Sequence, residues 1–268
     1  MAGTTPTRLH RDLMPAVFIG HGSPMNALDH NRFTEAWQTF GLNVAKPRAI
    51  LCISAHWYTN ATAVTAMPTP RVIHDFYGFP DELFAYDYPA PGSPEVAELV
   101  VEAAKPTWVG LDHDSWGIDH GTWSVLAHMF PEADVPVLQL SINAVQPLEY
   151  HLDLGARLAG LREQGVLIVG SGNIVHNLRR TDWARQDNGF DWSLRFDEAA
   201  KTLLGQRPGD VLEMTSHPDF AMAVPTPDHF IPMLYIAALA AQSGEKPRVL
   251  VEGPSYGSIS MTSYSIGL

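Results

Sequence analysis

The chain has 268 residues, 46% of them hydrophobic and 17% charged, which is enough to bury the core of one α/β domain. Acidic residues outnumber basic residues 29 to 17, and the formal net charge of −12 argues against nucleic acid as a partner, because phosphate backbones recruit lysine and arginine. No stretch approaches the roughly 20 apolar residues that cross a bilayer, so we expect no membrane partner and a location in the cytoplasm.

Four short runs rich in Val, Ile and Leu predict strands that are buried on both faces of a sheet. In chain order they cover residues 15–20, 48–54, 135–142 and 165–172, and Gly, Ser or Asn ends or follows each of them. We expect these to be the central strands. The proline-rich stretch 68–94 is the longest irregular segment, and loops of that length within a domain are often functional.

Apolar residues at helical spacing predict helices between these strands. Ser93 before Pro94 is a typical helix start, and Gly165 is a typical stop for a helix that begins at residue 147. Pro232 has to lie in the first turn of a further apolar helix, which we therefore expect to begin near residue 231. The other predicted helices begin at residues 31, 93, 121 and 193.

Strands and helices that alternate in this way predict an α/β fold, with a central, largely parallel or mixed sheet flanked by helices. We expect a single domain over residues 1–268, with residues 1–14 as an N-terminal tail. Open α/β sheets bind ligands at the C-terminal edge of their strands, so the active site is expected at that edge.

Three of the twelve histidines come directly after predicted central strands, namely His21, His56 and His176. Any one of them alone is most simply a loop histidine that makes a hydrogen bond, but three at equivalent positions favour a shared site. His229 adds a fourth at the start of an apolar helix. Converging neutral imidazoles without a cysteine cluster suit a divalent metal such as Fe, Zn, Cu or Ni, although the close-spaced HExxH signature is missing.

These histidines and the residues around them form six motifs that together resemble the class III extradiol ring-cleavage dioxygenases. The similarity is greatest to the branch that opens 3,4-dihydroxyphenylalanine (DOPA) between ring carbons 4 and 5. It runs in order from about residue 15 to 264 and so covers nearly the whole chain. The motifs are FIGHGSPMNAL (18–28), ISAHWYT (53–59), HDFYGFP (74–80), DHGTWSVLAHMFP (119–131), GSGNIVHNL (170–178) and TPDHFIPMLYIAALA (226–240).

The resemblance implies that His21, His56 and His229 hold a non-haem metal. Related ring-cleaving enzymes use two histidines and one carboxylate, so a histidine in the third place is a departure that leaves the native metal open. His176 falls where the family carries its active-site base, and in this branch it could also reach the metal. His120 matches a second pocket histidine, which we expect to donate a hydrogen bond to substrate or oxygen.

The same motifs suggest residues that contact the substrate. Glycines on both sides of His21 allow unusual backbone angles and leave space for a ligand. The HDFYGFP motif lies in the irregular segment, which could form a wall of the pocket. The implied substrate contacts are Gly22, Ser23, Asp75, Tyr77 and Asp119, and Asp119 is also expected to orient His120.

This set of residues suits the opening of a catechol ring with dioxygen, which would give a muconic semialdehyde. We expect Fe(II) for activity, because it offers open positions for the catechol and O2 together. Zn(II) is plausible in a purified sample, because its affinity for imidazole sites is higher. His176, with an ordinary pKa of about 6.5, would take a proton from the catechol near neutral pH.

Two other classes of function stay open at this point. A zinc-dependent hydrolase would also place histidines at strand ends, with a bound water and a general base. A non-catalytic metal-binding protein could use the same fold, although it would be expected to have lost a metal ligand or His176. The physiological catechol and assembly into a homo-oligomer are left open as well.

Overall fold

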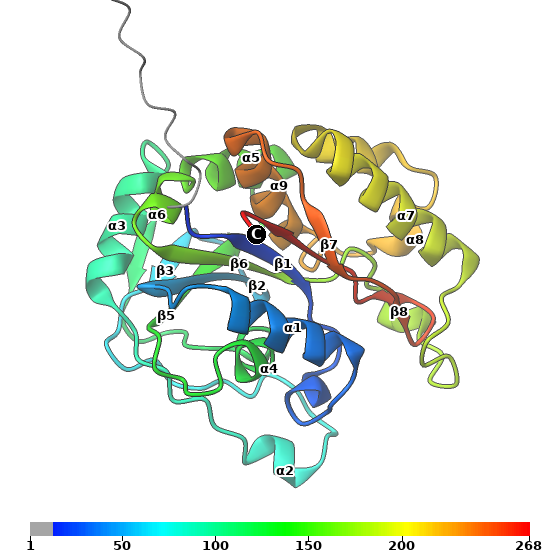
Figure 1. Ribbon diagram of the computed structural model, residues 1–268, viewed down its shortest axis with the longest axis horizontal. Coiled ribbons are helices and arrows are strands. Elements are labelled where there is room, and N and C mark those ends of the chain that lie inside the picture. Colours follow the sequence, from blue (N-terminus) through cyan, green and yellow to red (C-terminus); the bar gives the residue numbers. More distant parts are fainter. Residues whose placement is uncertain (1–12) are drawn as a thin grey trace, which may run out of the picture.

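An eight-stranded mixed sheet runs through the centre of the computed structural model, which describes residues 13–268 (Figure 1). Its strands lie in the order β4-β3-β5-β2-β6-β1-β10-β7, and β8 and β9 pair outside it. The predicted tail, residues 1–14, falls almost wholly outside the described residues. The strands are β1 (Ala16–Gly20), β2 (Ala49–Thr59), β3 (Ala63–Thr65), β4 (Gly110–Asp112), β5 (Val137–Asn143), β6 (Val166–Gly172), β7 (Arg248–Val251), β8 (Pro254–Ser255), β9 (Ile259–Ser260) and β10 (Ser263–Ile266).

The four strands predicted from the apolar runs lie side by side at the centre of the sheet, in the order β5-β2-β6-β1, and they run parallel. The outer strands make the sheet mixed, since β10 pairs antiparallel with β1, β7 with β10, and β3 with β5. Strands β3, β4, β7 and β10 contain only three or four residues each. Runs this short show no clear periodicity, which is why the sequence did not indicate them.

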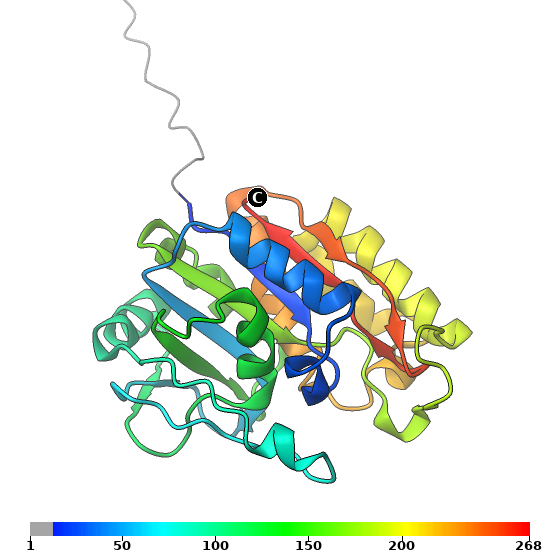
Figure 2. The same ribbon diagram turned by 60° about the horizontal axis from the view of Figure 1, so that its bottom comes forward.

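Helices cover both faces of the sheet. Successive strand residues point to opposite faces, and in β1 Phe18 joins the core under α5 and α9 while Val17 and Ile19 join the core under α1 and α4. Figure 2 shows α1 and α4 in front of the sheet with α9 behind it. No helix among residues 13–268 is long and apolar enough to cross a membrane. The α-helices are α1 (Arg32–Asn43), α2 (Asp81–Phe84), α3 (Pro94–Ala104), α4 (His120–Met129), α5 (Leu148–Arg157), α6 (Gly160–Glu163), α7 (Asp191–Gln206), α8 (Phe220–Ala223) and α9 (Ile231–Ser243).

The predicted helix starts agree with the structure. The hydroxyl of Ser93 accepts a hydrogen bond from the backbone N–H of Val96 and caps α3, and Pro232 lies in the first turn of α9. One predicted helix differs, because the segment from residue 147 splits into α5 and α6. The break falls at residues 158–159, between Arg157 at the end of α5 and Gly160 at the start of α6.

Two glycines of β6 let α9 approach the sheet closely. A Cβ atom on Gly170 would lie 2.6 Å from the carbonyl oxygen of Pro232, and one on Gly172 would lie 2.3 Å from that of His229. The backbone N–H of Asn173 donates to the same His229 oxygen at 2.9 Å. Glycine is therefore required where the helix entrance meets the strand, and His229 is brought to the C-terminal end of β6.

Strand β2 is longer than predicted, because it continues to Thr59 instead of ending at residue 54. Its pairing with β6 stops at Ser54, and its pairing with β5 shifts register between Ile53 and Tyr58. His56 thus lies inside the strand, in a part without regular pairing, and not after the strand as expected. It still lies at the C-terminal edge of the paired central strands.

Candidate active site

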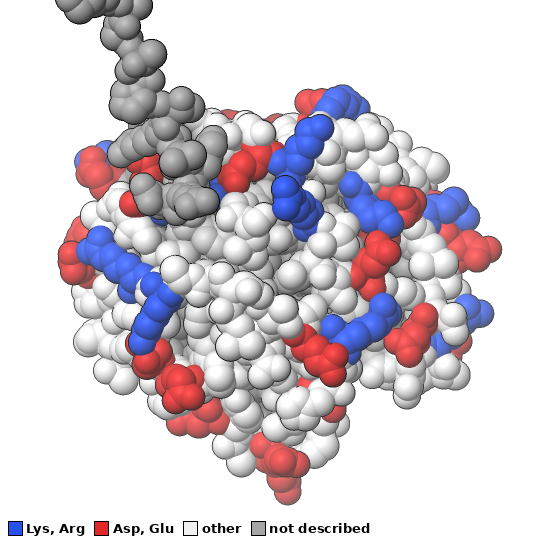
Figure 3. Space-filling model, in the orientation of Figure 1, with Lys and Arg blue, Asp and Glu red and all other residues white. Residues whose placement is uncertain are grey.

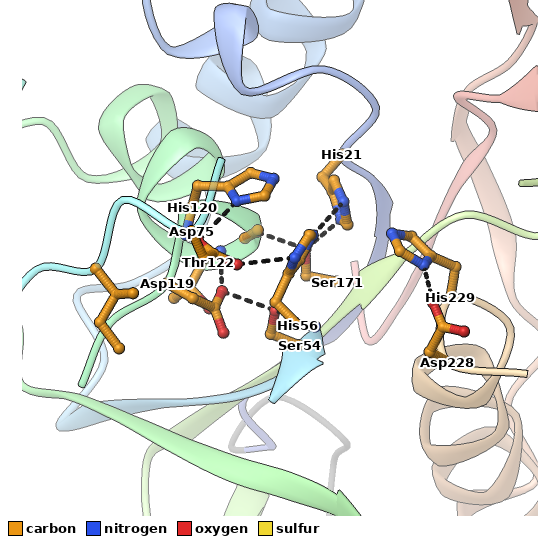
Figure 4. Close-up of polar contacts among 12 residues, drawn as sticks. His21, Ser54, His56, Asp75, Asp119, His120, Thr122, Ser171, Asp228 and His229 are labelled. Atoms are coloured by element: carbon orange, nitrogen blue, oxygen red, sulfur yellow. Dashed lines mark hydrogen bonds and ion pairs between the residues drawn. The ribbon is translucent and has the colours of Figure 1, made fainter. Parts of the chain in front are cut away.

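Five histidines meet at the C-terminal edge of the parallel strands, and they are the five singled out from the sequence. The ring centroids of His21 and His56 are 5.1 Å apart, and each lies 5.3 Å from the centroid of His229. The ring of His120 is 3.9 Å from that of His56, and the ring of His176 is 3.5 Å from that of His229. Figure 4 shows His21, His56, His120 and His229 around a shared space.

A chain of hydrogen bonds through Ser171 holds the ring of His21. The hydroxyl of Ser171 donates to the carbonyl oxygen of Gly121 at 2.5 Å, so its oxygen accepts from Nδ1–H of His21 at 3.0 Å. This bond selects the tautomer in which Nε2 of His21 carries a lone pair. That atom lies 3.2 Å from Nε2 of His56, so two ring nitrogens face each other across the site.

Asp75, from the irregular segment, binds two of the histidines. Its Oδ2 accepts from Nδ1–H of His56 at 2.9 Å, and its Oδ1 accepts from Nδ1–H of His120 at 2.8 Å. Oδ1 also accepts from the backbone N–H of His120 at 3.1 Å. Both imidazoles therefore present Nε2 lone pairs to the site when they are neutral.

Asp119 does not orient His120, and this prediction was wrong. Asp119 is fully buried at the N-terminus of α4, where its carboxylate accepts from the backbone N–H of Thr122, from the Ser54 hydroxyl and from the side-chain amide of Gln139. An aspartate that caps a helix aims its side chain at the free N–H groups of the first turn. These contacts place Asp119 beneath the histidines and not on a surface that a substrate could reach.

His229 is held by its neighbour in sequence, because the Asp228 carboxylate accepts from Nδ1–H of His229. In Figure 4 the other ring nitrogen points toward His21 and His56. The ring of His176 stacks on that of His229 with only 7° between their planes. Within the described residues the His176 ring makes no hydrogen bond, so both of its nitrogens are available.

The donor atoms fit a divalent metal. When both rings are neutral, two lone pairs face each other at 3.2 Å and cannot hydrogen-bond, and a cation bound by both nitrogens satisfies them. Ligands at about 2.0–2.1 Å from a tetrahedral metal are about 3.3 Å apart, which matches the separation of the two Nε2 atoms. Donor atoms lie within 4.8 Å of one another in two sets, His21 with His56 and His120, and His176 with Asp228 and His229. The pair therefore has two candidates for a third ligand, the predicted His229 and His120.

Burial and the crowding of imidazoles control the charge of the site. Burial lowers the pKa of His21 and of His176 well below the ordinary value, and neighbouring imidazoles lower both further. Burial also acts to lower the pKa of His56, but the hydrogen bond to Asp75 and nearby carboxylates outweigh it and raise that pKa. The ordinary pKa expected for His176 therefore does not apply, and its ring is neutral at neutral pH, the form that accepts protons and binds metals.

Three other predicted residues lie near the site without a contact to its imidazole rings. Gly22 has a φ of +63°, and the Met261 sulfur occupies the space beside it that a substrate was expected to use. Ser23 caps the short 3-10 helix Pro24–Ala27 through the backbone N–H of Met25. Tyr77 is 92% exposed. Their roles as substrate contacts stay predictions.

Phe76 belongs to the HDFYGFP motif that was predicted to form a wall of the pocket, whereas Asp228 and Ser171 were not predicted as site residues. Phe76 packs edge-on against His120, with ring centroids 5.5 Å apart, and so lies beside Asp75 as a second contact between the irregular segment and the histidines. Asp228 could have been suspected, because a carboxylate directly precedes a candidate ligand. Ser171 had no local signal, since it contacts His21 across 150 residues of sequence.

The chain is similar in sequence and in structure to several known proteins. A family profile described as the catalytic LigB subunit of aromatic ring-opening dioxygenase matches residues 15–267. The chain is 46% identical over 259 residues to the 4,5-DOPA dioxygenase extradiol of Escherichia coli (strain K12), covering 95% of both chains. It is 37% identical to that of Beta vulgaris, covering 92% of this chain and 96% of the relative. The crystal structure of an uncharacterized Escherichia coli K12 protein matches with a TM-score of 0.82 and 41% identity, covering 94% of this chain and 99% of the other.

Proposed function

The chain belongs to the LigB family of aromatic ring-opening dioxygenases and is an extradiol ring-cleavage enzyme, and we propose that it opens DOPA between ring carbons 4 and 5. The observation that carries this proposal is the pair of Nε2 atoms of His21 and His56, which lie 3.2 Å apart while the Nδ1 atom of each ring is bonded to an oxygen behind it. The names of the relatives support DOPA as the catechol. The product is a muconic semialdehyde.

For the metal we propose Fe(II), held by the Nε2 atoms of His21, His56 and His229. When bound there, Fe(II) supplies open coordination positions at which a catecholate and dioxygen meet. Each ligand keeps its orientation through an oxygen that accepts its Nδ1–H, from Ser171, Asp75 and Asp228 respectively. Zn(II) suits the same nitrogen donors, so zinc in a purified sample would agree with this proposal.

The remaining two histidines handle protons. His176 is neutral and its ring is free of hydrogen bonds, so it accepts a proton from a catechol hydroxyl. His120 bonds Asp75 through Nδ1–H, which makes its Nε2 an acceptor and not the donor that was predicted. His120 becomes a donor to substrate or oxygen only after it has taken up a proton itself.

Several sequence predictions remain proposals. The substrate contacts of Gly22, Ser23 and Tyr77 rest on the family motifs alone. We also propose that the protein is located in the cytoplasm and that it assembles as a homo-oligomer.

Oxygen consumption tests the proposed activity. The protein is loaded with Fe(II) without air and then given DOPA, other catechols or hydroquinone in air-saturated buffer. We expect uptake of one O2 per ring opened with DOPA and, when ¹⁸O2 is used, both labelled atoms in the product. Uptake with hydroquinone but not with catechols would contradict extradiol cleavage. Ester or amide turnover by a zinc-loaded sample without oxygen uptake would favour the hydrolase.

A further inference from the structure

The Asp75 carboxylate accepts hydrogen bonds from two histidines that have different proposed roles. Its side chain is 20% exposed and reaches the site from the irregular segment, with Oδ2 on His56 and Oδ1 on both the ring and the backbone N–H of His120. An ionised carboxylate only accepts hydrogen bonds, so both rings have to donate Nδ1–H to it. In the neutral rings, each Nε2 atom then carries a lone pair.

Contacts on both sides of Asp75 hold its backbone in place, so the position of the carboxylate is defined although it lies in an irregular segment. The backbone N–H of Ile73 donates to the carbonyl oxygen of Ile118 at 2.8 Å, and that of Ile118 donates to Arg71 at 2.9 Å. On the other side, the Phe76 ring packs between His120 and Trp123, with centroids 5.5 and 6.1 Å away. The segment holds Asp75 in place from both directions.

From this geometry we propose that Asp75 is a positioning residue that sets the tautomers of His56 and His120 together and so determines that Nε2 of His56 faces the metal. The inference rests on the proposed role of His56 as a ligand. It replaces the direct substrate contact expected for Asp75, because both carboxylate oxygens are already used by the two histidines.

The variant Asp75→Asn should change the tautomer of His56 but not that of His120. The backbone N–H of His120 can only donate, so it selects the amide oxygen for the place of Oδ1. The amide NH2 group then takes the place of Oδ2 and meets Nδ1–H of His56, donor against donor. His56 relieves this conflict by carrying its proton on Nε2, the atom that faces His21. His120 keeps its original tautomer, although it touches the same side chain.

The test reads the tautomers directly by two-bond ¹H–¹⁵N correlation on full-length protein labelled at histidine, with and without diamagnetic Zn(II). In the wild type we expect Nδ1–H on both rings. In metal-free Asp75→Asn we expect Nε2–H on His56 and unchanged Nδ1–H on His120. Competition with a chromophoric chelator should show Zn(II) affinity lowered by about 10- to 100-fold. Asp87→Asn removes the same charge from an exposed position of the same segment, and it should change neither measurement.

Asp75→Glu separates hydrogen bonding from packing, because it alters the side-chain length but keeps an acceptor-only carboxylate. We expect it to keep Nδ1–H on His56 and to bind Zn(II) more tightly than Asp75→Asn does. Unchanged tautomers in Asp75→Asn, or equal shifts of both rings in both variants, would overturn the proposal. None of these measurements uses turnover, so a protein that fails to open DOPA but shows the tautomer change would refute the proposed substrate and leave the role of Asp75 intact.

Discussion

Each of the three proposed ligands has one ring nitrogen bonded to an oxygen and one facing the site. The oxygens differ in kind, since His21 relies on a serine hydroxyl and the other two on carboxylates. A hydroxyl can rotate and a carboxylate cannot donate, so the carboxylates fix the tautomer more firmly. His120 and His229 are both candidates for the third ligand, because each donates Nδ1–H to a carboxylate.

Single substitutions distinguish the two candidates for the third ligand. We expect His229→Ala to lower bound metal and activity together, because a three-ligand site loses an anchor. His120→Ala should keep the metal and lose turnover, because its proposed task is proton transfer. Metal content by mass spectrometry, measured beside oxygen uptake, decides between them. The reverse result, with metal lost only in His120→Ala, would make His120 the third ligand.

His176 should act as a base and not as an anchor. The variant His176→Gln is expected to retain stoichiometric metal and to bind catechol, yet to lose about 100- to 10,000-fold in rate, the usual contribution of a positioned proton acceptor. Metal content that falls in proportion to activity would instead identify a ligand. Full turnover in a metal-replete variant would exclude both roles and assign the proton chemistry to His120.

At the level of elements, the contact between β6 and the start of α9 positions His229. We expect Gly172→Ala to cost about 1–3 kcal/mol of unfolding free energy, because the new methyl group would lie 2.3 Å from the His229 carbonyl oxygen. It should also weaken metal binding, because α9 must shift. Chemical unfolding and chelator competition measure the two effects.

Gly205→Ala is the matched control for that substitution. Gly205 lies in α7, and a Cβ atom there would meet nothing within 4 Å. Alanine has the higher helix propensity, so we expect stability to rise by about 0.5–1 kcal/mol with unchanged metal affinity. Equal effects of the two variants on metal binding would refute the role assigned to the close contact.

The packing of α5 against α9 contains a buried histidine outside the site. His151 donates from Nε2 to the Asn143 carbonyl oxygen at 3.2 Å and accepts from the Tyr235 hydroxyl at 3.0 Å, and burial lowers its pKa to about 4. The unfolded chain binds a proton near pH 6.5, so the stability that His151 contributes is complete above that pH. It is lost progressively as the pH falls from about 6.5 to about 4, by about 3 kcal/mol in total.

The variant His151→Gln should remove this pH dependence, because glutamine offers the same donor and acceptor without titrating. Urea unfolding at pH 7 and pH 5 should show that the wild type loses about 1–2 kcal/mol more than the variant over this interval. A wild-type loss equal to that of the variant would mean that His151 is protonated in the folded protein or that its burial has no cost.

The net charge of the protein does not attract an anionic group of a substrate. The formal net charge is −12, and Figure 3 shows acidic and basic side chains interspersed over the upper part of the visible face, with acidic ones at its lower end. That end corresponds to α2 in Figure 1, whose first turn contains Asp81 and Glu82. The carboxylate of an amino acid catechol therefore has to be bound by a local group, because the negative net charge of the protein does not attract it.

Metal binding should stabilise the entire fold, because the proposed ligands lie directly after β1, within β2 and just before α9. At a free metal concentration about 100 times the Kd, the gain is about 2.7 kcal/mol, which corresponds to a rise in Tm of about 5–10 °C for a domain of this size. Differential scanning fluorimetry with Zn(II) measures the shift. The double variant His21→Ala with His56→Ala should lose it, and an equal rise in that variant would show that the stabilising ion binds elsewhere.

The features that depend on neighbouring residues were correctly predicted from the sequence. Continuous Val, Ile and Leu identified the four central strands, because a strand covered on both faces has no polar side. Ser93 and Pro232 located the starts of α3 and α9, because caps and proline act within one turn. The motifs identified the family, and each candidate histidine lies in one of them.

The groups that orient those histidines could not be predicted from the sequence and became evident from the folded chain. Asp119 precedes His120 directly and was expected to orient it, yet Asp75 does so from 45 residues away. Neighbours at a helix start point in different directions, so adjacency along the chain did not reveal the partner. The short outer strands followed the same rule, since they exist through pairing with distant segments and have no pattern of their own. Hydrogen bonds between distant residues form only when the chain packs, so the local pattern of apolar and polar residues does not predict them.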